Sequence, residues 1–285
     1  MTSEPVERRT KVWLGAAAFV VVGLVAGVAS LRRAHPERTA WPDPSAPLVV
    51  APLSLPPAFG TRRIFLDAGH GAPNNPGNTS ALCEREQDFT RSLARDVAAA
   101  LSRSGPFEVR LSRSGGELVP YAERVQAARA WHADAFVSLH SDVRGRSEPW
   151  SPAPGQSCLR NHDAPGFSVL WSDDATEPLR SRRKALAENV ATELGAMGLL
   201  PYRGKEYHAD YAADAGHAGV FVDRHPHANR IFVLWRPSMP SVIVETHNAR
   251  DDREVLRFRE PATRRAFARA LARALVRTLT PALSG

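Results

Sequence analysis

From residue 61 onward, short apolar segments alternate with amphipathic segments of helical period, and this alternation restricts the fold more than any other feature. The apolar segments cover residues 63–67, 108–111, 135–139, 167–171, 231–234 and 242–244. The helical segments cover residues 87–102, 120–131, 178–197 and 261–279. In the first helical segment, Phe89, Leu93, Val97 and Leu101 recur at four-residue spacing on one face. The pattern predicts one α/β domain with a mostly parallel central sheet flanked by helices on both faces.

The length of the chain is consistent with one such domain. Of the 285 residues, about 225 remain once the first sixty are set aside. This is enough for one well-packed α/β core, whereas two full domains would be cramped. We therefore expect a single folded domain over residues 61–283.

The first sixty residues have a different character. Residues 12–31 carry no charge and would span about 30 Å as a helix, the thickness of a bilayer core. We expect an uncleaved transmembrane anchor preceded by a cytoplasmic N-terminus at residues 1–11. A cleaved signal peptide is the alternative, because residues 27–29 (Gly-Val-Ala) resemble a cleavage site. Either way, the rest of the chain is expected in the cell envelope, on the periplasmic or extracytoplasmic side of the inner membrane.

A proline-rich segment follows the apolar run. Seven prolines lie between residues 35 and 60, a density that opposes helix formation and removes backbone hydrogen-bond donors. We expect residues 32–60 to form an extended linker that holds the domain away from the membrane.

Charge and cysteine content exclude some kinds of site. The net charge is +7 and comes almost wholly from arginine. The arginines are scattered, with no dense basic run interleaved with aromatic residues, so the sequence does not predict a nucleic-acid partner. The two cysteines, Cys83 and Cys158, form no Cys-x-x-Cys motif, which argues against a thiolate zinc site. In an exported domain they could form a disulfide, and two unpaired thiols are the alternative.

Polar residues follow three of the predicted strands. Residues 64–66 run into Asp-Ala-Gly-His-Gly at 67–71, residues 136–139 run into His140, and residues 242–244 run into Glu245. If these strands are parallel, their carboxyl ends meet at one edge of the sheet, where open α/β sheets bind ligands. Two histidines and a carboxylate at that edge suit a catalytic zinc ion that keeps a fourth position for water.

Five segments of the sequence resemble, in order, the zinc-dependent N-acetylmuramoyl-L-alanine amidases of the amidase-3 type. The Asp-Ala-Gly-His-Gly segment resembles the family's Asp-Pro-Gly-His-Gly opening, with Ala68 in place of proline. The other four segments are residues 86–94, beginning Glu-Gln-Asp-Phe; 123–128, beginning Glu-Arg-Val; 133–140, Ala-Asp-Ala-Phe-Val-Ser-Leu-His; and 240–246, Pro-Ser-Val-Ile-Val-Glu-Thr. The resemblance extends from residue 64 to about residue 256.

The resemblance implies a role for each matching residue. His70, Glu86 and His140 would bind one Zn²⁺, and Glu245 would be the catalytic carboxylate. The bond cut would join N-acetylmuramic acid to the L-alanine of the peptidoglycan stem peptide. Peptidoglycan is thus the expected partner, with the membrane contacted through the N-terminal segment and a protein activator as an open question. Glu84, two residues from Glu86, is the rival ligand.

Other residues and functions stay open at this stage. His247 could face the site or be an ordinary loop histidine. The polar insertion 203–229 could form a substrate wall, a second metal site or a surface loop, and residues 143–165 form a second insertion. A zinc amidohydrolase acting on another amide, or a wall-binding module without catalysis, would be the alternative functions.

Overall fold

The fold is described from a computed structural model, which describes residues 41–43 and 46–280. The expected anchor at residues 12–31 lies outside these described residues. Across the part of the chain that is described, no helix is long and apolar enough to cross a membrane.

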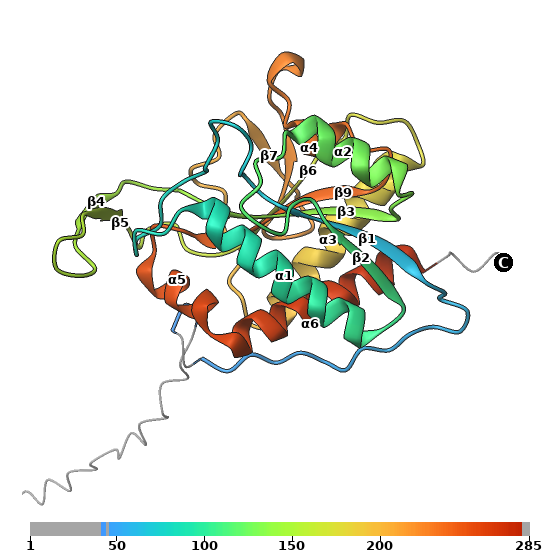
Figure 1. The fold of residues 1–285 in the computed structure, drawn as a ribbon, viewed down its shortest axis with the longest axis horizontal. Helices are drawn as coiled ribbons and strands as arrows, with labels where there is room; N and C mark the ends of the chain where they lie inside the picture. Colours follow the sequence, from blue (N-terminus) through green and yellow to red (C-terminus); the bar gives the residue numbers. More distant parts are fainter. Residues whose placement is uncertain (1–40, 44–45, 281–285) are drawn as a thin grey trace, which may run out of the picture. The chain divides into compact units, whose positions relative to one another are not determined.

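A seven-stranded sheet forms the centre of the domain, with the strand order β2–β1–β3–β9–β6–β8–β7 (Figure 1). The strands are β1 (Arg62–Ala68), β2 (Phe107–Leu111), β3 (Ala135–Asp142), β6 (Ser168–Trp171), β7 (Tyr211–Ala213), β8 (Val220–Asp223) and β9 (Ser241–Asn248). Strands β2, β1, β3 and β9 run parallel to one another, and β6 pairs antiparallel with β9. Strand β8 is parallel to β6, and β7 is antiparallel to β8. The predicted mostly parallel sheet is therefore confirmed, and its direction reverses between β9 and β6.

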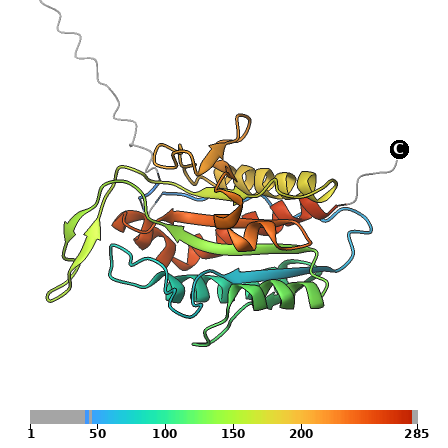
Figure 2. The same ribbon diagram turned by 90° about the horizontal axis from the view of Figure 1, so that it is seen from above.

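Helices cover both faces of this sheet, as predicted. They are α1 (Glu86–Ser104), α2 (Tyr121–Ala130), α3 (Leu179–Ala196), α4 (Phe232–Trp235), α5 (Asp252–Arg259) and α6 (Pro261–Leu279). Helices α1, α3 and α6 pack together on one face, while α2 and α4 lie on the other (Figure 1). A separate two-stranded hairpin, β4 (Glu148–Trp150) and β5 (Cys158–Arg160), projects from one end of the domain (Figure 2).

The alternation of side chains along each strand divides the core in two. In β9, Val242 and Val244 pack into the core beneath α1, α3 and α6, while Ile243 packs into the core beneath α2 and α4. Strand β1 divides in the same way, with Ile64 in the first core and Phe65 in the second. This period of two is what a strand with both faces covered requires.

Several elements differ from the sequence-based expectation. Residues 231–234, expected as a strand, form the N-cap and the first three residues of the short helix α4. An apolar run of four residues does not distinguish a strand from a buried helical turn by periodicity. Strands β7 and β8 lie inside the insertion 203–229, and helix α5 lies between β9 and α6, where no element was expected.

The described part of the proline-rich segment is extended, as its composition predicts, and it lies on the domain rather than apart from it. We call residues 46–59 the strap. Along the helical layer of α3 and α6, the strap's Val49 amide donates to the Met197 carbonyl, and Arg273 of α6 donates to the Pro52 carbonyl. Just before the strap, the Trp41 ring packs edge-on against Phe258 of α5. Among the described residues, contact of the expected spacer with the domain therefore extends back to Trp41.

Candidate metal centre

A tight turn after β1 brings the first predicted ligand into place. His70 has a φ of 58°, in the left-handed region, so the turn bends sharply just after the strand ends. The neighbouring Gly69 is required because a Cβ there would lie 2.3 Å from Nε2 of His140. A Cβ at Gly77 would lie 2.6 Å from Oε2 of Glu86 and 2.7 Å from the His70 ring. The glycines allow the backbone to approach the three predicted ligands closely.

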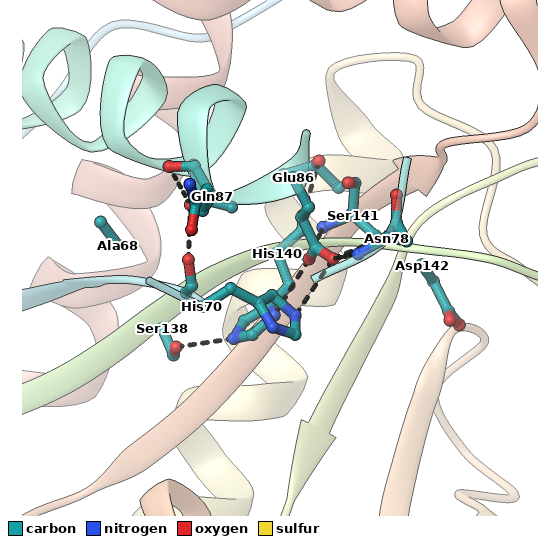
Figure 3. A network of polar contacts seen from close by, with 12 residues as sticks. Ala68, His70, Asn78, Glu86, Gln87, Ser138, His140, Ser141 and Asp142 are labelled. Atoms are coloured by element: carbon teal, nitrogen blue, oxygen red, sulfur yellow. Dashed lines mark hydrogen bonds and ion pairs between the residues drawn. The ribbon is translucent and has the colours of Figure 1, made fainter. Parts of the chain in front are cut away.

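Glu86 and the two histidines converge at the carboxyl edge of β1 and β3 (Figure 3). Nε2 of His70 lies 3.0 Å from Oε2 of Glu86, and Nδ1 of His140 lies 3.1 Å from Oε1 of Glu86. One ligand atom from each residue lies within 4.8 Å of those of the others. Glu86 is the first residue of α1, and His140 lies near the end of β3. Two imidazoles and one carboxylate form a donor set that fits a catalytic zinc ion.

Polar neighbours orient each of the three side chains. Asn75 Oδ1 lies 2.8 Å from Nδ1 of His70, which leaves Nε2 to face Glu86. The Asn78 side chain and the backbone amide of Ser141 both donate to the Glu86 carboxylate, at 2.7 and 3.0 Å. The Ser138 hydroxyl lies 3.1 Å from Nε2 of His140. Such outer contacts fix the direction in which ligands point.

Electrostatics keep Glu86 in its anionic form. Burial of the carboxyl group raises its pKa, but hydrogen bonds and charge from His140 and His70 outweigh burial and lower the pKa well below its usual value. The pKa of His70 is raised: burial lowers it, and the hydrogen bond and charge of Glu86 raise it by more. A carboxylate that stays charged while nearly buried is a suitable cation ligand.

A buried ion pair between Arg124 and Asp67 stabilises the turn that carries His70. Arg124 of α2 donates to Oδ1 of Asp67 at 2.9 Å and to the carbonyl oxygens of Ala68 and His70. The Ser138 hydroxyl donates to the other Asp67 oxygen at 2.6 Å. Burial raises the Asp67 pKa, yet Arg124 and Ser138 hold that pKa below its usual value. The Asp-Ala-Gly-His-Gly segment is therefore fixed through its backbone carbonyls as well as its carboxylate.

Glu245 lies beside this cluster, in register with His140 across the β3–β9 pair. Its Oε2 atom is buried and has no hydrogen-bond partner among the described residues. Burial raises the pKa of Glu245 well above its usual value, and the nearby charges of Asp142 and Glu86 raise it further, while Arg144 opposes them. A partly buried carboxylate with a raised pKa and a free oxygen is suited to accept and release a proton.

A pocket of about 270 Å³ opens at the cluster. Its floor includes His70, His140 and Glu245, and its walls are mostly apolar or aromatic: Tyr121, Leu170, Tyr211, Ile231, Phe232, Val233 and Ile243. Three predicted site residues therefore line one cavity. Glu86 does not line it but contacts both histidines. A concave, largely apolar site with a few convergent polar groups is typical of small-molecule and peptide recognition.

His247 points away from this pocket. Between His140 and Asp142 the β3–β9 register shifts, so that Thr246 and His247 together oppose Ser141. A β-bulge of this kind reverses which side chains face each side of the sheet. The His247 ring is stacked on Phe258 with ring centroids 4.8 Å apart, and burial lowers its pKa to about 3. His247 is therefore a neutral core residue.

The structure also places the other residues whose roles the sequence left open: Glu84, the insertion 203–229 and the two cysteines. Glu84 faces Arg259, with its Oε1 atom 2.7 Å from that guanidinium, and lies outside the ligand cluster. From the insertion 203–229, Tyr211 reaches the pocket wall, whereas the histidines of this segment do not line it. Cys83 and Cys158 form a disulfide, which joins the loop before α1 to the β4–β5 hairpin.

Several site residues carry no sequence signal of their own. Tyr121 and Tyr211 line the pocket but lie 90 positions apart, and only the fold brings them together. Asn75 and Asn78 lie in the Asn-Asn-Pro-Gly-Asn run that follows the His70 turn, a composition that predicts a loop without assigning it a task.

Comparisons with known proteins agree with this geometry. The family model described as N-acetylmuramoyl-L-alanine amidase matches residues 64–277. The chain is 29% identical over 208 residues to the amidase AmiC of Neisseria meningitidis, covering 64% of this chain and 44% of that protein. It is 27% identical over 206 residues to AmiA of Escherichia coli, covering 66% of this chain and 65% of that protein. The chain thus spans about half to two thirds of the length of these curated relatives.

Solved structures share the fold. The amidase Ami1 of Mycobacterium smegmatis aligns with a TM-score of 0.59 at 23% identity, covering 78% of this chain and 98% of that one. An amidase of Clostridium difficile 630 aligns with a TM-score of 0.57 at 19% identity, covering 76% and 95%. Because the family model matches well over half of the sequence, in the order the motifs predict, the chain belongs to the N-acetylmuramoyl-L-alanine amidase family of the amidase-3 type.

Proposed function

We propose that this protein hydrolyses the amide bond between N-acetylmuramic acid and the L-alanine of the peptidoglycan stem peptide, using one Zn²⁺ held by His70, Glu86 and His140. The observation that carries the proposal is the convergence of these three side chains, with ligand atoms within 4.8 Å of one another, beside a pocket that His70 and His140 line together with Glu245. Family membership supports the identity of the bond.

The chain's own residues would divide the work as follows. Zn²⁺ at this site would supply Lewis acidity, which lowers the pKa of water and polarises the scissile carbonyl. Glu245 would accept the proton of the attacking water at its unpartnered Oε2 atom and deliver it to the leaving amine. The raised pKa of Glu245 makes its carboxylate a stronger base, which favours uptake of the proton from water.

The pocket walls would orient the substrate. Tyr121 stands on the α2 side of the cluster and Tyr211 on the side of the insertion. Their rings offer apolar faces for the sugar and lactyl carbons and hydroxyl groups for the peptide. We assign the insertion 203–229 the role of a substrate wall through Tyr211.

The enzyme would act in the cell envelope, outside the cytoplasm and anchored by residues 12–31. Peptidoglycan lies there, and the Cys83–Cys158 disulfide is the kind of bond that persists in an oxidising compartment. One structural relative, the amidase CwlD of Clostridioides difficile, was solved in complex with the GerS lipoprotein. This makes a protein activator a reasonable further partner to test for the present chain.

Digestion of purified peptidoglycan tests the proposal. We expect the zinc-loaded protein to release intact stem peptides with free L-alanine amino ends, identified by mass spectrometry. The Glu245→Ala variant should keep its zinc and lose turnover by about 10²- to 10⁴-fold, the usual contribution of a general acid–base group. The His70→Ala and His140→Ala variants should lose both the zinc ion and the turnover.

The controls separate this function from its rivals. Cleavage of other amides without release of stem peptides would identify a different amidohydrolase. A metal-free protein that still binds sacculi would be a binding module. Full activity of Glu245→Ala would refute the assigned proton transfer.

A further inference from the structure

Helix α6 presents a row of arginines on its exposed side. Arg265, Arg269, Arg273 and Arg277 follow one another at four-residue spacing, and α6 contains no acidic residue. Arg273 and Arg277 both pair with Glu193 of α3. Arg265 and Arg269 are exposed and form no ion pair with any residue that the structure describes. Arg265 and Arg269 therefore carry positive charge that no ion pair of the described residues neutralises, with Glu260 at the start of the helix as the acidic residue in the same groove.

Apolar side chains of the strap lie beside these arginines, and further exposed apolar side chains lie along the strap and on α5. A groove of about 440 Å³ runs between the strap and α6, with Leu48 and Val50 on one side and Arg265 and Arg269 on the other. Between the two strap residues, Val49 is 70% exposed, the highest value for any large hydrophobic residue described. Leu256 of α5 and Leu55 of the strap are each 40% exposed. We call α6 with the strap and Leu256 the arginine face.

The arginine face and the pocket lie on opposite sides of the central sheet. Residues Leu271 and Leu275 of α6 pack in the core that contains Val242 and Val244 of β9. The pocket is lined instead by Ile243 of β9, whose side chain lies on the other face. Figure 1 shows the strap and α6 below the sheet and α2 and α4 above it. A surface that binds the arginine face would leave the pocket unobstructed.

The length of the chain brings this face close to the proposed anchor. Trp41 is fixed on α5, where its Nε1 donates to Oε1 of Glu254 at 2.6 Å and its ring contacts Phe258. Only ten peptide units separate Trp41 from Leu31, the last residue of the apolar run, and these reach at most about 35 Å. Because the strap is packed on the domain, it adds no length to this connection. The connection to the proposed anchor therefore joins the described domain beside α5, next to the start of the strap.

We propose that the arginine face docks on the anionic phospholipid surface of the membrane that holds residues 12–31, with the pocket directed away toward the cell wall. Arg265 and Arg269 would meet the phosphate groups, and Val49, Leu55 and Leu256 would enter the boundary between headgroups and acyl chains. Charge and apolar contact together bind a membrane surface more stably than either alone. The docking rests on the anchor proposed above.

Hydroxyl-radical footprinting of the full chain in nanodiscs tests the docking. Neutral discs contain phosphatidylcholine, and anionic discs contain phosphatidylcholine mixed with phosphatidylglycerol. We expect oxidation of Val49, Leu55 and Leu256 to fall in anionic discs relative to neutral ones. Leu118 and Leu159, which are also exposed but lie elsewhere, serve as internal controls and should label equally in both. High salt should restore the lost labelling, because it screens the attraction.

Matched variants identify the charges responsible. The Arg265→Gln/Arg269→Gln double variant should lose the protection, whereas Arg110→Gln/Arg146→Gln, which removes two exposed arginines away from α6 and the strap, should keep it. Digestion of soluble peptidoglycan fragments in detergent should be unchanged in both, which separates this proposal from the proposed catalytic function. Equal labelling of Val49, Leu55 and Leu256 in the two kinds of disc would overturn the docking. Protection of these residues by anionic wall polymer but not by anionic discs would also overturn it.

Discussion

At the scale of single residues, the candidate metal centre depends on glycines without side chains as much as on the candidate ligands themselves. Gly69 and Gly77 leave space that the His140, His70 and Glu86 side chains occupy. Since His70 itself has a positive φ, the turn combines a strained ligand with neighbours that have no side chain. Small changes in this turn should therefore affect the ligands before they affect the fold.

Replacing Gly69 with alanine tests this dependence. The added Cβ would lie 2.3 Å from Nε2 of His140, so the imidazole must move. We expect Gly69→Ala to bind zinc more weakly and to lose most activity, measured by metal content after dialysis and by peptidoglycan digestion. Gly116→Ala, where no atom lies within 4 Å of the added carbon, is the matched control and should behave as the parent protein. Normal zinc content in Gly69→Ala would contradict the crowding argument.

The choice between Glu86 and Glu84 can be decided by zinc titration. Glu86 contacts both histidines, whereas Glu84 forms an exposed ion pair with Arg259. We expect Glu86→Gln to weaken zinc affinity by more than about 100-fold, beyond the loss seen when outer contacts are removed. Glu84→Gln should change affinity little and stability by less than about 1 kcal/mol, since exposed pairs contribute little. The reverse order of effects would make Glu84 the ligand.

The sequence predicts which candidate site residues meet better than it predicts what surrounds them. His70, His140 and Glu245 follow apolar strands, and parallel strands deliver their carboxyl ends to one edge, so their meeting could be anticipated. The side of the sheet that His247 faces could not be anticipated. A one-residue bulge in β9 determines that side, and the bulge is not visible in the hydrophobic pattern of the sequence. Tyr211 reaches the pocket from a polar insertion whose strands lack a clear alternation.

At the scale of elements, the long helices and central strands are the parts that periodicity predicts. Helices α1 and α6 match the expected segments closely because each carries an apolar stripe several turns long. Helix α4 and strands β7 and β8 are only three or four residues long, too short to show a period. Their form is set by tertiary contacts, such as the packing of Val233 and Leu234 into the core beneath α2 and α4.

The disulfide joins the loop before α1 to strand β5 and should contribute to stability. It closes a loop of 75 residues between Cys83, just before α1, and Cys158 in β5. Loop closure of this length corresponds to about 4 kcal/mol through the reduced entropy of the unfolded chain. We expect Cys83→Ser/Cys158→Ser to lower the free energy of unfolding by about 2–5 kcal/mol in denaturant titrations. Addition of a dithiol reductant to the parent protein should give a similar loss, and a loss below about 1 kcal/mol would argue against a closed disulfide.

At the scale of the whole molecule, one buried carboxylate connects the N-terminal segment with the sheet. Glu254 of α5 accepts hydrogen bonds from Trp41 Nε1, from the Gly166 amide and from the Asn248 amide at the end of β9. Burial raises its pKa to about 7, although Arg144 and the Asn248 amide act in the opposite direction. The attachment of residues near 41 should therefore depend on pH.

The sign of this dependence follows from linkage. Because the folded state binds the Glu254 proton more tightly than the unfolded state, stability is highest below the unfolded pKa of about 4.5 and falls as pH rises to about 7. The shift corresponds to about 3 kcal/mol at most. We expect the free energy of unfolding of Glu254→Gln to vary less than that of the parent protein across this range. An identical pH profile for the two proteins would exclude Glu254 as the source.

The reversal of strand direction beside β9 has a consequence for how members of this family can diversify. The proposed zinc ligands come from β1, α1 and β3, before the reversal, whereas Leu170, Tyr211 and Phe232 of the pocket wall come from elements on or beside the antiparallel side. Substitutions or insertions in the stretch between β6 and α4 can therefore change the pocket wall. They would leave β1, α1 and β3, which carry the proposed zinc ligands, unchanged. For protein engineering, that stretch is the natural place to build new selectivity into an otherwise unaltered hydrolytic scaffold.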